Sequence, residues 1–478
     1  MDLGSPRTTI AGLTVGLFRA IPEPLVPSLN TTYEGHMARS GHDSTPDPDN
    51  SPGAINAAVN PGEGNSRRFS AFQYRNYRLF FTGQLISVTG TWMQSLAQSY
   101  LVYEVLGASP FELGLVNVFQ FAPVLLLGIP AGIVADRLPK RNILVVTQSI
   151  FALLALVLTV LVALGQAQVW HVYAVATVFG ITNAFDMPTR QAFVSEMVGK
   201  ESVMNAIALN ATLFNTGRVL GPAIAGLVLA FFGTAVCFGI NAVSYIAVIT
   251  GLLMMRIKPA KSRAVGSAGA RLREGLAYVR ATPNIFRPII LVGIVGVFGM
   301  NFPVWVPMLA SDSFDSGGET YGLLFASMGV GSLVGAFTLA MFGRAPIRRR
   351  MLSAAIGLGL VEIILGVGVS IPIPLVMGMV CLAMAGFASS NMMSTANSIV
   401  QTTSSEGLRG RVMAVYMTVF AGTAPFGSLV TGAIADRFGV GMSLGLCGMV
   451  TFIATIIIIW AQRDRTIIAS HAATVQGS

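Results

Sequence analysis

Five charged side chains stand within or at the ends of long apolar stretches, and their types could do chemistry there. They are Asp136, Asp186, Arg190, Arg218 and Glu362. A charge at the centre of a bilayer costs about 2.5–3.5 kcal/mol on insertion scales, so an intramembrane charge is a functional candidate by default. The pKa of an aspartate follows the distance to its partner and its hydration. We predict one network that a proton could switch, made of Asp136, Asp186, Arg190 and Arg218; a static structural network is the alternative.

Depth along the apolar stretches sets the expected pairs in this network. Arg218 lies roughly 18 Å into its stretch and Asp186 roughly 7 Å from the end of its own, at 1.5 Å per residue. These two can therefore meet only through the long arginine side chain. Asp136 and Arg190 both lie at the same surface and form the better-matched pair. Glu362 stands alone at mid-depth in its stretch.

The composition shows what surrounds these charges. Of the 478 residues, 53% are hydrophobic and 11% are charged, whereas average soluble proteins carry roughly 25% charged residues. Soluble, disordered, collagenous and disulfide-rich classes are excluded, and a lipid bilayer is the expected surrounding. Helices are expected because every backbone N–H and C=O must be satisfied within lipid. The sequence predicts twelve spans, at 79–104, 111–135, 142–164, 169–190, 206–231, 234–255, 288–310, 321–343, 351–370, 373–398, 411–435 and 440–461.

The Lys and Arg residues predict the orientation. With both termini in the cytoplasm, 28 of the 30 basic residues fall in cytoplasmic segments, while Arg437 lies outside and Arg218 within a span. Such a one-sided distribution indicates a multi-pass protein of the plasma (inner) membrane. The net charge of +9 therefore reflects topology, and no nucleic-acid partner is expected.

The chain is expected to have five parts. They are a disordered cytoplasmic tail (1–66), an N-terminal six-helix half (67–256), a cytoplasmic linker (257–287), a C-terminal six-helix half (288–461) and a cytoplasmic C-terminal tail (462–478). Aligning the halves at an offset of 206 residues without gaps superimposes five glycine pairs: Gly180/Gly386, Gly221/Gly427, Gly226/Gly432, Gly233/Gly439 and Gly239/Gly445. We predict two pseudo-symmetric halves with a substrate site near the midplane between them.

Polar side chains recur along one face of the first span. Gln84, Ser87, Thr91, Gln94 and Gln98 are spaced by three or four residues, which places them on one helix face. Lipid would reject this face, so it points either to a neighbouring helix or to a wet cavity. Further candidates for a cavity lining are Asn301 and Trp305 in the seventh span and Asn391 and Ser394 in the tenth. A lining of amide, hydroxyl and aromatic groups suits a bulky, mostly apolar solute better than a sugar.

A motif between the second and third spans combines Gly132, Asp136, Arg137, Lys140 and Arg141. A small residue lets two helix ends approach closely. An acid among basic residues at a helix end can act as a charged latch that holds one conformation, although a plain positive-inside turn is the alternative. The spacing Gly-x-x-x-Asp-Arg-x-x-Lys-Arg resembles motif A of the major facilitator superfamily, whose members have twelve helices in two six-helix halves. Pro139 replaces the usual second glycine of that motif.

The fifth span holds a second motif, made of Gly217, Gly221, Pro222 and Gly226. Taken by itself it is a glycine-rich packing face. It resembles motif C, which in the same superfamily marks antiporters and hence efflux. The stretches 72–80 and 186–193 are similar to the branch of enterobactin-type exporters and drug efflux permeases.

The resemblance has implications for two of the candidates above. Because the first span lines the cavity in that superfamily, the polar stripe is interpreted as substrate lining. The ninth span is peripheral in that arrangement, so Glu362 is then either a functional acid or a protonated acid buried in a packing seam.

Several classes of function are excluded by what the sequence lacks. No Gly-x-x-x-x-Gly-Lys-Ser/Thr sequence is present, so no ATP-driven pump domain is expected. The cysteines and histidines have no metal-ligand spacing and no catalytic constellation is visible, so we expect no enzyme, metal or cofactor. The leading interpretation is a monomeric secondary transporter that exports a small, largely apolar drug, siderophore or secondary metabolite by proton-coupled alternating access. An importer or proton symporter of a small metabolite is the runner-up, followed by a non-transporting receptor or scaffold.

Overall fold

The computed structural model describes residues 69–256, 268–314, 318–341, 347–369, 371 and 373–476. All of them belong to one compact unit, Asn60–Ser478. Within these ranges the chain forms helices and no strand, which confirms the predicted all-helical class. The predicted tail, 1–66, and the first part of the predicted linker, 257–267, lie outside the described residues.

The N-terminal half opens with a short turn, Ser70–Gln73, and five helices follow. They are α2 (Arg75–Tyr100), α3 (Pro110–Arg137), α4 (Lys140–Ala163), α5 (Val169–Glu196) and α6 (Val203–Met254), with a π-helical turn η3 (Leu101–Val105) after α2. The start of α3 is fixed by a capping box. The Ser109 hydroxyl accepts from the Glu112 N–H, and the Glu112 carboxylate accepts from the Ser109 N–H at 2.8 Å. These bonds satisfy two N–H groups that would otherwise lack partners.

The C-terminal half follows a short helix, α7 (Ala268–Ala281), which lies in the predicted linker. Its other elements are α8 (Pro283–Phe298), α9 (Phe302–Met308), the π-helical turn η5 (Leu309–Ser313), α10 (Gly318–Met341), α11 (Ile347–Gly368), α12 (Leu375–Thr403) and α13 (Arg409–Gln476). The predicted seventh span is thus broken between α8 and α9. The chain is also helical through most of the predicted tail 462–478, as far as Gln476.

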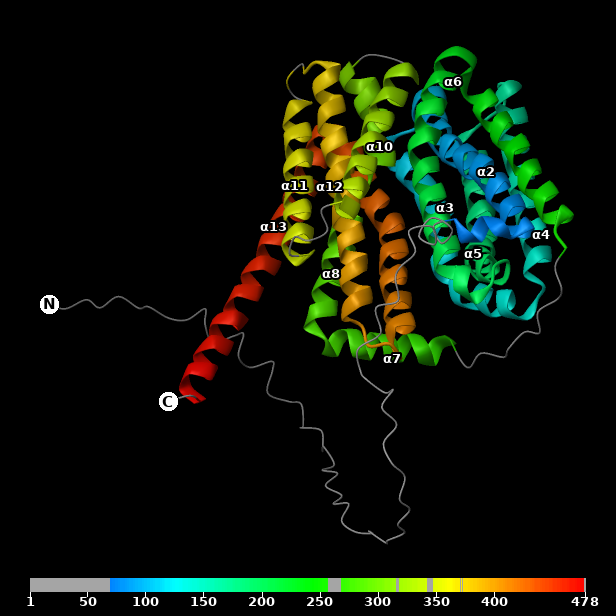
Figure 1. Cartoon of the computed structure of the whole chain (residues 1–478). Helices are drawn as coiled ribbons and strands as arrows, with labels where there is room; N and C mark the ends of the chain where they lie inside the picture. Colours follow the sequence, from blue (N-terminus) through cyan, green and yellow to red (C-terminus); the bar gives the residue numbers. More distant parts are fainter. Residues whose placement is uncertain are drawn as a thin grey trace, which may run out of the picture. The chain divides into compact units, whose positions relative to one another are not determined.

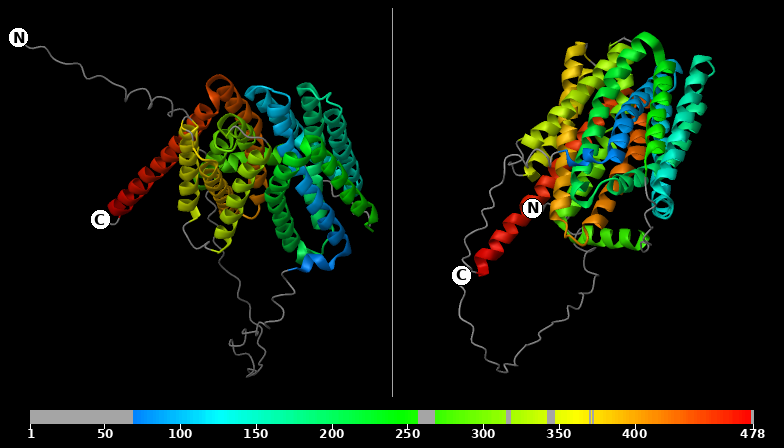
Figure 2. Two further views of the ribbon diagram at one scale, coloured as in Figure 1. Left: turned by 90° about the horizontal axis from the view of Figure 1, so that it is seen from above. Right: turned by 45° about the vertical axis from the view of Figure 1, so that its right-hand side comes forward.

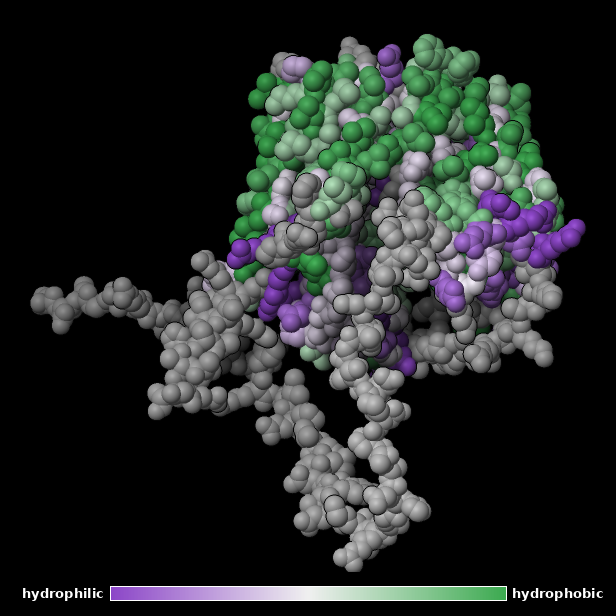
Figure 3. Space-filling model, in the orientation of Figure 1, coloured by the Kyte–Doolittle hydropathy of each residue, from purple (hydrophilic) through white to green (hydrophobic). Residues whose placement is uncertain are grey.

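Eight of the described helices are long and apolar enough to cross a membrane. Two of them, Val203–Met254 and Arg409–Ala461, run for 52 and 53 residues, or about 80 Å, against a hydrocarbon core of about 30 Å. The helices α2 and α5 are not among the eight because they carry more polar residues. Large apolar side chains cover much of the face in view, while hydrophilic residues gather toward one end (Figure 3).

Both long helices bend at a glycine in the left-handed region. Gly233 in α6 has φ 77° and Gly439 in α13 has φ 82°, a conformation that glycine adopts without the clash of a Cβ. The bends fall between the predicted fifth and sixth spans and between the predicted eleventh and twelfth. Each long helix therefore has the length for two crossings, but the total of twelve stays a prediction.

The two halves repeat the same internal contacts. Gly180 of α5 packs against the backbone of Gln120 in α3, and its repeat partner Gly386 of α12 packs against the backbone of Met328 in α10. Figures 1 and 2 show the helices up to α6 grouped apart from α8 to α13. These matching contacts support the predicted pseudo-symmetric halves.

The halves also contact each other through repeat-related glycines. Gly226 of α6 meets Gly322 of α10 directly, and a Cβ on Gly432 of α13 would lie 2.7 Å from the carbonyl oxygen of Pro110 at the start of α3. Nearby, the Tyr103 hydroxyl donates to Asp312, with oxygen distances of 3.0 and 3.1 Å. All these contacts lie at the helix ends predicted to face outward, so the structure is closed at its predicted outer end.

The α7 helix is tied to the neighbouring ends of the C-terminal half. Glu274 of α7 forms an ion pair with Arg411 at the start of α13. A hydrogen bond with Ser405 lowers the pKa of Tyr278. These contacts hold α7 against the end of the bundle that is predicted to be cytoplasmic (Figure 1).

Candidate functional site

The clearest polar cluster surrounds Asp186, whose side chain is fully buried in α5. Its carboxylate accepts hydrogen bonds from Thr147 at 2.8 Å and from Gln148 at 2.9 Å, both on α4. Arg190, one turn further along α5, forms an ion pair with the same carboxylate and donates to the Gln84 side chain of α2 at 2.9 Å. The cluster therefore joins α2, α4 and α5 through one buried negative charge. We refer to these five residues as the Asp186 cluster.

The Asp186 cluster changes the pairing expected from the sequence. Arg190 was matched with Asp136, but the structure pairs it with Asp186, because residues four apart on a helix lie on the same face. The Asp136 side chain lies outside the described residues. Sequence reasoning missed Thr147 and Gln148; their polarity within the apolar stretch of α4 was the signal that could have found them.

Arg218 stands apart from the Asp186 cluster. Its guanidinium lies over the ring of Trp92 on α2, with its central carbon 5.2 Å from the ring centroid, a favourable cation–π distance. Among the described residues it has no acidic partner. The residue is exposed. In this conformation Arg218 is not joined to the Asp186 cluster, and the single network stays a prediction.

The polar stripe of α2 contacts neighbouring helices. Besides Gln84, which binds Arg190, Thr91 lies 3.1 Å from the Tyr245 hydroxyl, and Gln94 accepts from Asn241 at 2.6 Å. Tyr245 and Asn241 both belong to the second part of α6. Of the two sequence alternatives, the structure favours the neighbouring helix over the wet cavity for these three residues. Gln98, further along the stripe, is buried as well.

The cavity candidates of the C-terminal half are also held by protein contacts. The Asn301 amide donates to the Val297 carbonyl at 2.6 Å, across the break between α8 and α9. The Trp305 indole is fully buried and donates to Ser443 at 3.0 Å. Asn391 of α12 accepts from Arg350 of α11 at 2.9 Å. In this conformation these three side chains hold helices together, because each forms a hydrogen bond with another group of the protein.

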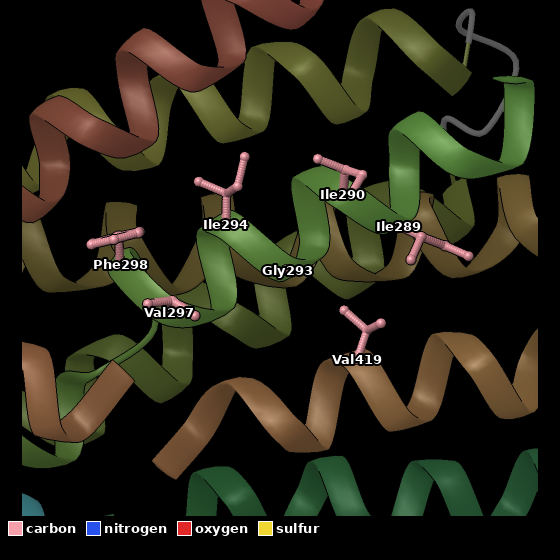
Figure 4. A pocket seen from close by; sticks show the side chains of 7 residues that line it. All are labelled: Ile289, Ile290, Gly293, Ile294, Val297, Phe298 and Val419. Atoms are coloured by element: carbon pink, nitrogen blue, oxygen red, sulfur yellow. The ribbon is translucent and has the colours of Figure 1, made fainter. Parts of the chain in front are cut away.

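Ser394 is the remaining cavity candidate, and its side chain is partly exposed. An apolar cavity of about 310 Å³ lies elsewhere, between α8 and α13. Figure 4 shows its lining, which is Ile289, Ile290, Gly293, Ile294, Val297 and Phe298 of α8 with Val419 of α13. It shares no residue with the predicted lining and offers no hydrogen-bonding side chain, so it fits an apolar group.

The basic residues between α3 and α4 bind helix ends. Lys140 forms an ion pair with Glu196 at the end of α5, with a distance of 2.6 Å. Arg141 donates to the carbonyl oxygens of Leu252 and Leu253 at 2.7 and 2.8 Å, where a cation offsets the negative end of α6. These contacts fasten α4 to α5 and α6.

Two other members of the predicted latch make no such contact. Arg137 is exposed at the end of α3. Around Gly132 no described atom lies within 4 Å of where a Cβ would be, so the close helix approach expected there is absent.

The glycines of the motif in the fifth span do make close contacts. A Cβ on Gly217 would lie 2.7 Å from Val88, and one on Gly221 would lie 2.5 Å from Trp92, both on α2. Gly226 meets Gly322 of the other half. Pro222 lies within α6 beside these glycines. The motif thus brings α6 into close contact with α2 and α10.

Glu362 of α11 is fully buried, like Asp186, but neither of its carboxyl oxygens has a hydrogen-bond partner in the described part of the chain. It is therefore not part of the Asp186 cluster. No group of three or more His, Cys, Asp or Glu side chains in the described ranges could hold a metal ion.

Comparison with known proteins places this architecture in a family. Residues 66–473 match the family described as transmembrane secretion effector. A staphyloferrin A transporter of Staphylococcus aureus is 24% identical over 81% of this chain and 96% of its own length. The multidrug efflux pump Tap of Mycolicibacterium fortuitum is 25% identical over 76% of this chain and 89% of its own.

A third relative, the enterobactin exporter EntS of Escherichia coli, is 23% identical over 79% of this chain and 87% of its own length. Among solved structures, a POT family transporter in complex with a thioalcohol-conjugated peptide matches with a TM-score of 0.66 at 12% identity. That match covers 82% of this chain and 96% of the other. The family match spans most of the chain, and the chain therefore belongs to the transmembrane secretion effectors of the major facilitator superfamily, which are membrane transporters and not enzymes.

Proposed function

We propose that this protein exports a small, largely apolar molecule across the plasma (inner) membrane in exchange for protons, by alternating access. It works as a monomer with both termini in the cytoplasm. Two relatives, a multidrug efflux pump and an enterobactin exporter, support the outward direction. The close helix contacts of Gly217, Gly221 and Gly226 support the same direction, because that motif marks antiporters.

The Asp186 cluster is the observation that carries the proton-coupled part of this proposal. Its carboxylate is buried, and its partners come from α4 and from α5 itself. Adding a proton to Asp186 removes the charge that Arg190 neutralises, so the ion pair loses most of its strength. Arg190 also holds Gln84 of α2, and a change at Asp186 therefore reaches two neighbouring helices. A buried pair with two discrete arrangements is the kind of element that switches a conformation.

The substrate class rests on the apolar cavity between α8 and α13. Its seven lining residues contribute no hydrogen-bonding side chain. Such a surface stabilises an apolar group through burial of its area, whereas a sugar would lose hydrogen bonds there without replacement. Trp92 beneath Arg218 adds an aromatic surface in the other half.

Proteoliposomes with an imposed pH gradient test the coupling. Dye accumulation by the wild type is compared with that of Asp186→Asn, which keeps the side-chain volume but cannot bind a proton reversibly. We expect Asp186→Asn to lose accumulation against a gradient while it still equilibrates the dye. The control is Asp436→Asn, which changes an exposed acid of α13 and should behave as the wild type. Unchanged gradient-driven accumulation by Asp186→Asn would refute the coupling role.

Direction and substrate class need separate measurements. Everted vesicles that concentrate a lipophilic cation support export, whereas uptake of a small metabolite by whole cells favours the importer or symporter. A thermal-shift screen of lipophilic cations, siderophores and sugars tests the apolar preference. Stabilisation by sugars alone would contradict it.

A further inference from the structure

Glu362 is a buried acid that the Asp186 cluster does not use. Its side chain has 0% exposure, and both carboxyl oxygens lack a hydrogen-bond partner among the described residues. It lies 15 residues from the start of α11 and 6 from its end, which is about 9 Å from the end predicted to face outward. No other acid of the C-terminal half lies inside a predicted span.

Glycines bring α13 so close to Glu362 that little space is left around it. A Cβ on Gly448 of α13 would lie 2.7 Å from the Glu362 Cβ, and a Cβ on Gly359 would lie 2.8 Å from the Gly448 carbonyl oxygen. One turn further on, a Cβ on Gly366 would lie 2.6 Å from the backbone nitrogen of Gly445. Small residues at such a crossing let two helix backbones approach closely. We refer to this close contact of α11 and α13 around Glu362 as the seam. It leaves no room for a hydrated counter-ion.

The titratable groups that face Glu362 are few. On α13 it is Cys447, the residue before Gly448, which packs against Glu362. The part of α12 packed against α11 has one titratable residue, Cys381, and no interaction joins it to Glu362. No basic side chain contacts the carboxyl. An ionised carboxylate here would have neither a cation nor a hydrogen-bond donor of normal strength, and desolvation would oppose it. The carboxyl is therefore neutral in this conformation.

A line of polar groups leads from this seam to the contacts between the halves. Ser443 lies on α13 one turn before Cys447. Ser443 accepts from the Trp305 indole of α9 at 3.0 Å and donates to the Thr431 carbonyl at 2.9 Å. Thr431 precedes Gly432, which contacts the start of α3, and α9 packs against α2, α3 and η3. The line therefore ends at Gly432 of α13 and at α9, which both contact the N-terminal half at the predicted outer end.

We propose that Glu362 is a second proton-binding site and that its proton, by keeping α13 packed against α11, holds α9 and α13 in the arrangement that closes the predicted outer end. Loss of the proton creates a buried charge that only water can stabilise. The seam between α11 and α13 then opens, and the line to Trp305 and Thr431 shifts with it. This inference rests on the proposed proton coupling and adds a second acid, in the other half, to Asp186. Closure is present at low pH and is lost as the pH rises and Glu362 ionises.

Infrared spectroscopy of the full chain in lipid tests the protonation directly. A protonated carboxyl has a carbonyl stretch that a carboxylate or an amide lacks. We expect the wild type at neutral pH to show this band and Glu362→Gln to lose it, while Asp436→Asn retains it. Equal bands in the wild type and in Glu362→Gln would overturn the proposal.

Spin labels test the link to the outer end. Gln166 and Ile371 are exposed at the predicted outer ends of the two halves, and the three native cysteines are buried and stay in place. Labels at Gln166→Cys and Ile371→Cys report the distance between the halves without substrate or gradient. For the wild type and for Asp436→Asn we expect the open-to-closed ratio to rise about tenfold per pH unit over the pH range in which Glu362 ionises.

In the same assay Glu362→Gln should stay closed at every pH, because the amide mimics the protonated acid. If that variant does not fold, Glu362→Met supplies the same neutral side chain and the same expectation. A pH response in the neutral variant equal to that of the wild type, or no response in the wild type, overturns the inference. Because the assay uses no gradient, its outcome is independent of whether Asp186→Asn abolishes coupled transport.

Discussion

Asp186 and Glu362 are both fully buried acids inside apolar helices, yet their surroundings are opposite. Asp186 receives two hydrogen bonds from α4 and an ion pair from Arg190. Glu362 has no partner for either oxygen within the described residues, and a glycine of α13 lies against it. An ionised acid needs donors to replace the water it has lost, and a neutral acid needs far less. Equal burial therefore comes with a fully partnered acid in one half and an unpartnered acid in the other.

The largest expected effect comes from removing the charge of the partnered acid. Asp186→Ala leaves Arg190 without a counter-ion and deprives Thr147 and Gln148 of their acceptor, so we expect a loss of about 3–5 kcal/mol in the free energy of unfolding. Unfolding by denaturing detergent in mixed micelles measures it. The double variant Asp186→Ala/Arg190→Leu should recover part of this loss. If the double variant is as unstable as the sum of the single ones, the pair is not coupled.

A single donor to Asp186 should have a smaller effect. Thr147→Val keeps the shape of the side chain and removes one hydrogen bond to the carboxylate, so we expect a loss of about 2 kcal/mol. The matched control is Thr159→Val on the same helix, whose hydroxyl donates only to the Ala155 carbonyl at 2.8 Å. Equal losses in the two variants would show that the hydrogen bond to Asp186 contributes no more stability than one to a backbone carbonyl.

For Glu362 we expect substitution by an apolar residue to raise the free energy of unfolding instead of lowering it. Glu362→Met replaces two unpartnered polar atoms with an apolar group of similar length, and we expect a gain of about 1 kcal/mol. Glu362→Gln should leave the free energy of unfolding nearly unchanged, because its amide stays unpartnered. The same detergent titration compares the two. A clear loss in Glu362→Met would mean that the acid has a stabilising partner.

The smallest effect is expected for the exposed ion pair, which serves as the reference for the buried one. Lys140 and Glu196 are 2.6 Å apart but partly open to solvent. Exposed pairs contribute about 0.2–1 kcal/mol and weaken with salt, so Glu196→Gln should lower the free energy of unfolding by about 0.5 kcal/mol at low salt. A loss as large as that of Asp186→Ala would mean that the exposed and the buried ion pair contribute equally to the free energy of unfolding.

Much of the fold could be predicted from the sequence because lipid imposes simple rules. Apolar stretches indicated helices, and the offset of 206 residues paired Gly233 with Gly439, the two positions where the long helices bend. The break between α8 and α9 gave no such signal. Its apolar composition resembles that of a continuous helix, and only the local geometry at Asn301, whose amide binds the Val297 carbonyl, reveals it.

The candidate site was harder to predict, since its contacts are distant in sequence. A spacing of three and four residues places Thr91 and Gln94 on one face, but it cannot tell what lies opposite. Their partners are 154 and 147 residues away on α6. In the same way the sequence identified Asp186 and Arg190 as candidates. That Arg218 does not contact them depends on how α2 and α6 pack.

The bends at Gly233 and Gly439 have a practical consequence for experiments on topology. At each bend one helix passes into the next through a single glycine, so no separate loop lies between them. A reporter inserted at either glycine would break the helix and would report on misfolded protein. The turn at Gly165, between α4 and α5, has open space around it and is the better place for an epitope that determines which side of the membrane these ends face.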